Sequence, residues 1–139
     1  LDRVRQAGRE VYVRDPVYAN LDLDIRVCVA PGFFIGDVKE RVLDALVGTT
    51  AASRPRAFFS PDRFTFGTPL ERSALEAAIQ RVAGVRAVER ILLRRRGWFG
   101  WRPFRTLVYP VGTDEIIRVE NLPDFPERGS VRLDMEGGA

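Results

Sequence analysis

Residues 64–84, FTFGTPLERSALEAAIQRVAG, contain a candidate phosphate-binding turn. Gly67, Thr68 and Pro69 would join a strand to a helix, and a glycine turn at a helix N-terminus can offer free backbone N–H groups to a phosphate. The stretch has neither G-x-x-x-x-G-K-[ST] nor G-x-G-x-x-G. Thr68 at the N-cap and Glu71 three positions later would form a capping box that uses these donors itself. We therefore expect a structural helix start and no ligand.

Other residues that could take part in catalysis lack the partners that catalysis needs. Asp22 and Asp24 stand two apart on a predicted strand, which could pair two carboxylates for a metal or for acid–base chemistry. Nothing else in the sequence converges on them, so a solvated strand face is the favoured interpretation. Ser60, Ser73 and Cys28 have no histidine to activate them, because the chain contains none. We expect no enzyme activity, no cofactor and no metal site.

The most unusual segment is RRRGWFGWRPFR at residues 94–105, the tip of a predicted hairpin, which we call the tip. Tryptophan and arginine are enriched at interface hot spots, so a protein partner is one interpretation. An equally favoured one is a hairpin whose aromatics fold back over the sheet. Stacking on single-stranded nucleic acid and insertion at a membrane surface are less favoured. The candidate interface residues are Arg94, Arg95, Arg96, Trp98, Phe99, Trp101, Arg102 and Phe104.

Length and composition limit the class of protein. A chain of 139 residues with 45% hydrophobic and 29% charged residues is typical of one folded domain. No apolar run approaches the ~20 residues of a membrane span. All basic residues except Lys39 are arginine, a bias that a GC-rich genome explains better than function does. The net charge of +3 does not require a nucleic-acid partner.

Hydrophobic periodicity predicts the elements that would position these residues. Residues 21–29 alternate apolar and polar side chains, which predicts a half-buried strand. Residues 36–48 change to helical spacing, with Asp37 as N-cap and Gly48 as the C-terminal stop. Residues 63–67 predict a short strand, and the following helix would end at Gly84.

The second half of the chain predicts strands only. Residues 85–96 form the third strand, residues 104–110 return beside it, and residues 114–122 and 130–136 give two more strands. The order predicts an α+β fold, a mainly antiparallel sheet with two helices on one face. Its first five elements would form a ferredoxin-like β-α-β-α-β core, followed by C-terminal strands.

The predicted organisation is one domain with short extensions. Residues 1–20 would be an N-terminal arm or the tail of a preceding domain, and the chain begins without methionine, as a fragment would. Residues 21–136 form the single α+β sandwich, with the tip at 94–105. Residues 137–139 are expected to fray.

Residues 16 to about 93 resemble the C-terminal part of baseplate J-like proteins, wedge components of contractile phage tails and related injection machines. The resemblance lies in DPVYANLDLDIRVCVAPGF, in VKERVLDALVG and in RFTFGTPLERSALEAAIQRVAGVRAVERI. Its most specific part is Phe66-Gly67, a serine-containing helix, and then Val82 to Val85. From residue 94 onward it is looser: DEIIRVENLPDF and SVRLDME are similar to closing strands of the family, whereas the tip is not part of the pattern.

The resemblance implies a structural assembly protein, not an enzyme. It implies contacts with other wedge proteins and with copies of the chain, in the baseplate of a virion or phage-like particle that assembles in the bacterial cytoplasm. The alternative is a basic ferredoxin-like nucleic-acid-binding domain. RNA-binding sheets of that class display aromatics on their central strands, whereas residues 85–96 offer arginine, valine and leucine. A small enzyme that binds an anion through arginine is disfavoured because no base is evident.

Overall fold

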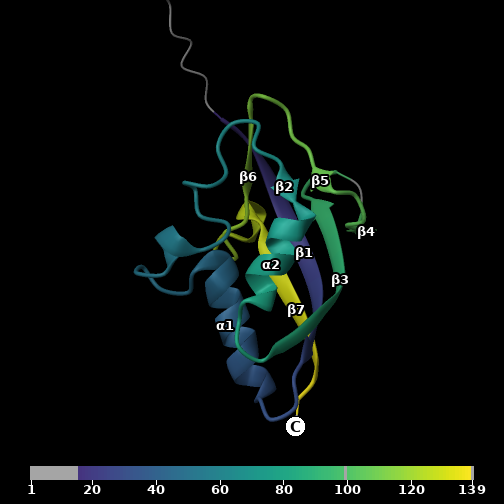
Figure 1. The fold of residues 1–139 in the computed structure, drawn as a ribbon. Coiled ribbons are helices and arrows are strands. Elements are labelled where there is room, and N and C mark those ends of the chain that lie inside the picture. Colours follow the sequence, from purple (N-terminus) through teal and green to yellow (C-terminus); the bar gives the residue numbers. More distant parts are fainter. Residues whose placement is uncertain (1–15, 99, 139) are drawn as a thin grey trace, which may run out of the picture.

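The structure is a computed structural model that describes residues 16–98 and 100–138. Figure 1 shows both helices on the same face of the sheet, so the expected α+β class with two helices on one face is confirmed. The elements in chain order are β1 (Val17–Val29), α1 (Ile35–Val47), η1 (Arg54–Arg56), β2 (Leu70–Glu71), α2 (Arg72–Gln80), β3 (Val85–Arg95), β4 (Arg102–Pro103), β5 (Val108–Tyr109), β6 (Glu115–Arg118), η2 (Pro126–Arg128) and β7 (Ser130–Gly137).

β1 is the central strand of the main sheet. β3 pairs antiparallel along one of its edges, while β6 and β7 pair parallel along the other, β6 with residues 17–20 and β7 with residues 22–29. β4 lies outside β3, and β2 pairs with β5 in a separate small sheet. Antiparallel pairings thus outnumber parallel ones, three to two. The expected ferredoxin-like order is not reproduced, because the chain between the two helices adds no strand to the main sheet.

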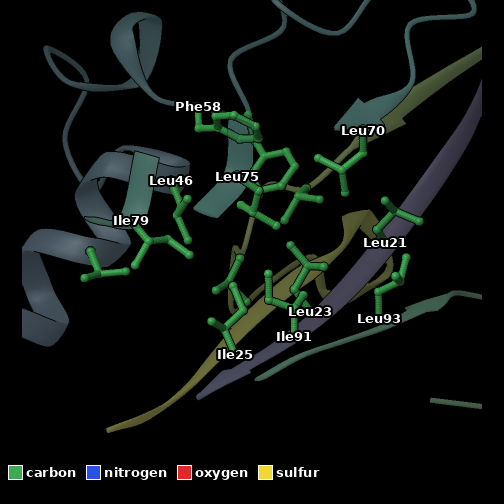
Figure 2. Packing of buried hydrophobic residues seen from close by; sticks show 14 of the residues in the cluster. Leu21, Leu23, Ile25, Leu46, Phe58, Leu70, Leu75, Ile79, Ile91 and Leu93 are labelled. Atoms are coloured by element: carbon green, nitrogen blue, oxygen red, sulfur yellow. The ribbon is translucent and has the colours of Figure 1, made fainter. Parts of the chain in front are cut away.

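The core lies between the sheet and the helices (Figure 2). Alternation along β1 sends every second side chain to this inner side, as a strand periodicity of two requires. α1 and α2 each bury one stripe of residues at helical spacing against the sheet, α1 beside β7 and α2 beside β3. The largest apolar side chains that are fully buried are Leu21, Leu23, Ile25, Val27, Val38, Val42, Leu46, Leu70, Leu75 and Ile79, with Val29 almost so.

The predicted strand at residues 63–67 is wrong, because this segment turns over the core. Phe64 is buried, with its ring centroid 5.7 Å from that of Phe58 and 5.4 Å from that of Phe59. Phe66, which the period of two in a strand would place on the same side as Phe64, is 53% exposed. Gly67 has a positive φ of 73° and donates its N–H to the carbonyl of Glu115. Packing of aromatic rings and a glycine turn replace the expected pairing.

The predicted capping box is also wrong. α2 begins at Arg72 with Glu71 at its N-cap position, and Glu71 makes no capping hydrogen bond through its side chain. Leu70 and Glu71 are instead extended and pair with β5. The Thr68 hydroxyl lies 3.1 Å from that of Thr65. Pairing with a distant strand therefore delays the helix by three residues relative to the predicted start at Pro69.

Pairing between distant segments also shifts the predicted ends of the folded domain. β1 begins at Val17, so residues 17–20 belong to the sheet and not to the expected arm. At the other end Gly137 pairs with Val29, and the Gly138 N–H donates to the Val29 carbonyl at 2.9 Å, where fraying was expected. Residues 1–15, Phe99 and Ala139 lie outside the described residues.

The ends of the predicted helix and hairpin shift as well. α1 begins at Ile35 and not after Asp37, whereas its predicted stop at Gly48 is confirmed, with a φ of 70°. β4, at residues 102–103, is the strand that pairs with β3, whereas the expected partner at 104–110 supplies β5, which pairs with β2.

Candidate protein-interaction surface

The outer face, the sheet face opposite the helices, is organised around a buried carboxylate. Asp22 projects from β1 and its side chain is fully buried. It accepts hydrogen bonds from Arg94 Nη2 at 2.8 Å and Nε at 3.1 Å, from Arg96 Nε at 3.2 Å and from Ser130 Oγ at 2.8 Å. The solvated strand face expected for Asp22 is wrong, because β3 and β7 flank β1 and their side chains cover the carboxylate.

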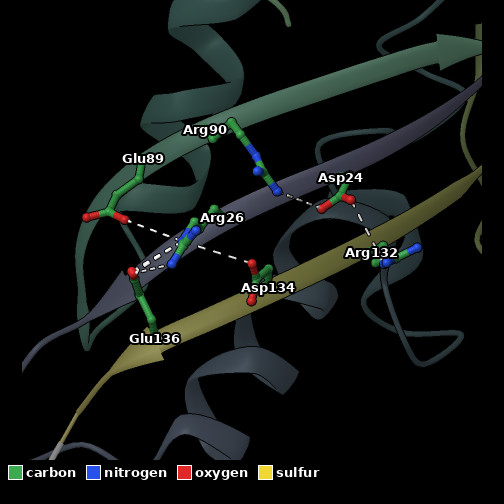
Figure 3. Close-up of polar contacts among 7 residues, drawn as sticks. All are labelled: Asp24, Arg26, Glu89, Arg90, Arg132, Asp134 and Glu136. Carbon is green, nitrogen blue, oxygen red and sulfur yellow. Dashed lines mark hydrogen bonds and ion pairs between the residues drawn. The ribbon is translucent and has the colours of Figure 1, made fainter. Parts of the chain in front are cut away.

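Asp24, two residues along β1, has weaker contacts. Its carboxylate lies 3.8 Å from Arg90 Nη2 and 3.9 Å from Arg132 Nε, beyond hydrogen-bonding distance (Figure 3). The two aspartates thus face arginines. Among the described residues no group of three or more His, Cys, Asp or Glu side chains is placed to hold a metal ion.

Further along β1 the signs are exchanged, because Arg26 is an arginine surrounded by carboxylates. It donates to the Glu136 carboxylate from Nε and Nη2 at 3.0–3.2 Å. Glu89 at 3.7 Å and Asp134 at 4.0 Å add to the negative surroundings (Figure 3). The hydrogen bond from Arg26 lowers the pKa of Glu136, and the same contact raises the pKa of Arg26. A bulge between β1 and β3 at this point lets Glu89 reach the outer face.

At the tip, Trp98 rests on an ion-paired arginine. Arg95 Nη2 donates to Glu115 at 2.6 Å, and the Arg95 side chain is only 9% exposed. Its guanidinium lies 4.3 Å from the centroid of the Trp98 ring, within cation–π range. The pKa of Glu115 is lowered by the hydrogen bond from Arg95 and by the backbone N–H of Gly112. Trp98 itself is 62% exposed on this fixed base.

Trp101 has the same arrangement on the other side of β3. Arg94 and Arg95 are successive strand residues, so their side chains leave toward opposite faces of the sheet. Arg94, held by Asp22, lies 4.7 Å from the Trp101 centroid. The two tryptophans therefore flank the end of β3 from its two sides.

A groove of about 320 Å³ lies beside Trp98. Tyr109 and Thr106 line it together with Pro103 and the stem of Arg95. Burial raises the pKa of the Tyr109 hydroxyl. An exposed indole next to a partly apolar groove is an arrangement that suits an anchoring contact with another protein.

The other predicted interface residues have different locations. Phe104 is buried in the core, 5% exposed, and its N–H donates to the Ile91 carbonyl, so it is removed from the surface that a partner could touch. Arg96 is held by Asp22. Arg102 lies in β4, and Phe99 falls outside the described residues. Of the predicted set, Trp98 and Trp101 remain as exposed aromatics on fixed arginines.

Sequence reasoning missed the residues that hold this surface in place. Glu115 and Ser130 come from strands far along the chain, and no local motif marks them. The available signal was the run of arginines at residues 94–96 opposite the two acidic positions of β1. The exposure of Leu107, which is 79% exposed, was not predicted either, because the residue lies within a segment predicted to be a strand.

A scan against protein-family models finds no match to this chain, and a search of curated proteins finds none either. No helix in the described part of the chain is long and apolar enough to cross a membrane.

Proposed function

We propose that this chain is a structural assembly protein, a wedge component of the baseplate of a contractile phage tail or a related injection system. The observation that supports it best is Trp98, a large exposed aromatic held on the Arg95–Glu115 pair beside a groove. Buried aromatic anchors carry much of the binding energy of protein interfaces. The resemblance of residues 16 to about 93 to baseplate J-like proteins is the reason for proposing a baseplate as the assembly.

The mechanism is geometric. The sheet and its two helices form a rigid base, and the ion pairs Arg95–Glu115 and Arg94–Asp22 fix the positions of the two indoles above it. A partner therefore meets side chains whose ordering has already occurred, which lowers the entropic cost of association. The partner we propose is another wedge protein that inserts an apolar side chain next to Trp98. The particle would assemble in the bacterial cytoplasm.

The test is a binding assay against the wedge, sheath and tube proteins encoded beside this chain's gene. Trp98→Ala should weaken capture of one of them by at least about tenfold, a loss typical of a hot-spot residue. Phe34→Ala is the matched control, because Phe34 is a 76% exposed aromatic before α1, away from the tip. Absence of these genes, or equal capture by both variants, would contradict the proposal.

The nucleic-acid alternative has a limited basis on the outer face, where Arg90 (43% exposed) and Arg132 (78% exposed) are the more accessible arginines. Arg94 and Arg96 are occupied by Asp22, and Arg26 by Glu136. β1 and β3 contain one aromatic residue, Tyr18, which is 40% exposed and has the Arg118 guanidinium 3.9 Å from its ring centroid. They therefore lack the two or three aromatics on which successive bases would stack. Salt-sensitive binding of oligonucleotides that depends on these arginines would favour the alternative over the assembly role.

A further inference from the structure

The outer face separates charge along the strands. One group of side chains, the arginine-rich cluster, contains four arginines and two aspartates, an excess of two positive charges. The other, the carboxylate-rich cluster, contains three carboxylates and one arginine, an excess of two negative charges. The first consists of Asp22, Asp24, Arg90, Arg94, Arg96 and Arg132, and the second of Arg26, Glu89, Asp134 and Glu136.

The two clusters are consecutive along β1. Asp22 and Asp24 precede Arg26, and Arg90, although paired in register with Arg26, directs its guanidinium toward Asp24 (Figure 3). On β7 the same order holds, with Arg132 beside Asp24 and Asp134 beside Arg26. Positive charge therefore collects on the part of the outer face near the first residues of β1, and negative charge on the part near the last residues of β1.

This pattern is self-complementary. A two-fold axis that lies between two outer faces and runs perpendicular to β1 would reverse the strand direction of the second copy. The arginine-rich cluster of each copy would then lie over the carboxylate-rich cluster of the other, as an isologous interface requires. A second copy in the parallel orientation would oppose like charges, which is unfavourable.

The side chains that would make these contacts are accessible. The Arg132 side chain is 78% exposed and that of Asp134 52%, while Arg90 and Glu89 are each 43% exposed. α1 and α2 cover only the opposite face (Figure 1). We propose that the outer face binds a second copy of this chain, with the strands antiparallel across the interface.

The size of the face sets the expected affinity. β1 and β7 pair over eight residues, which span about 26 Å, and three strands are about 14 Å wide. Such a footprint belongs to weak protein–protein contacts, whose orientation is fixed by charge. The inference extends the proposed assembly function, on which its biological meaning rests, but it is tested with this chain alone.

The test uses two double variants of the full chain in sedimentation-velocity experiments at high micromolar concentration. Arg90→Glu with Arg132→Glu makes both clusters negative, and Glu89→Arg with Asp134→Arg makes both positive. Each variant alone should dimerise about tenfold or more weakly than wild type, because like charges then face each other. An equimolar mixture should recover a heterodimer, and this recovery shows that both variants are folded.

Matched controls separate patterning from net charge. Lys39→Glu with Arg63→Glu lowers the net charge by the same amount as the first outer-face variant. Glu40→Arg with Asp62→Arg raises it by the same amount as the second. All four positions are exposed and lie on α1 or in the loop that follows it. These controls should dimerise like wild type. Wild-type dimerisation should also weaken as salt is added.

Three results would overturn the inference: a monomeric wild type at low salt, a mixture of the two outer-face variants that stays monomeric, or control variants that lose dimerisation equally. If the outer-face variants instead changed capture of a wedge protein while wild type stayed monomeric, the face would bind a different protein. If wild type dimerised as expected but no wedge protein bound to it, the proposed function would be contradicted and the dimer interface would stand.

Discussion

Replacement of Asp22 should destabilise the fold more than any comparable change on the outer face. Its fully buried carboxylate accepts four hydrogen bonds, from Arg94, Arg96 and Ser130. Asp22→Ala leaves the two guanidinium groups without their partner and opens a gap beneath them. Asp22→Asn keeps the shape and one oxygen acceptor but removes the charge.

The expected loss of stability depends on how deeply the Asp22 carboxylate and its two arginine partners are buried. Breaking a buried ion pair costs about 3–5 kcal/mol. Arg94 and Arg96 keep 36% of their side chains exposed, so water screens part of the loss and the lower limit applies. Asp22→Ala should therefore lower the free energy of unfolding by about 3 kcal/mol, and Asp22→Asn by about half of that. For a urea m-value of about 1.5 kcal/mol/M, the alanine variant shifts the midpoint down by about 2 M.

Urea unfolding at neutral pH, followed by circular dichroism, measures this effect. Asp124→Asn, at an exposed position before η2, is the control and should change stability by less than about 0.5 kcal/mol. The emission of Trp101 should also become easier to quench in Asp22→Ala, because Arg94 no longer holds a fixed position beneath it. An alanine variant as stable as the control would refute the role assigned to the carboxylate.

Two further predictions concern other contacts. Because the pKa of Glu115 is lowered, its contribution to stability is present above its ordinary pKa of 4.5 and is lost as pH falls through the lowered folded-state value. Glu115→Gln should therefore flatten the acid side of a stability–pH curve measured by urea unfolding, and an unchanged slope would contradict this. Gly129→Ala should cost more than about 2 kcal/mol in thermal unfolding, because φ is 94° and the new Cβ would lie 2.7 Å from the carbonyl oxygens of Arg118 and Leu21. A wild-type melting temperature would show that the backbone relaxes there.

Some elements could be predicted because their signals are local. α1 ends where Gly48 adopts a positive φ, and its apolar stripe repeats at helical spacing. β1 shows the alternation of a half-buried strand over most of its length. Such patterns depend on residues within one or two turns, so the sequence contains the information.

Other features depend on distant pairing and could not be predicted. Leu70 and Glu71 follow the helix-start signal at Thr68, yet they pair with Tyr109 and Val108, nearly forty positions away. Two parallel neighbours along a single edge of β1 have no local mark. Asp22 is buried by Ser130 of β7, Arg94 of β3 and Arg96 just after β3, which an alternating strand pattern cannot reveal.

Fluorine NMR of the fluorotryptophan-labelled chain tests the central claim most directly. The chain has two tryptophans and both lie in the tip, so the two resonances report on this region alone and can be assigned with Trp98→Phe and Trp101→Phe. When an unlabelled wedge protein is added, the Trp98 resonance should shift or broaden as the indole leaves water. Binding confirmed by sedimentation while the Trp98 resonance stays unchanged would contradict the account.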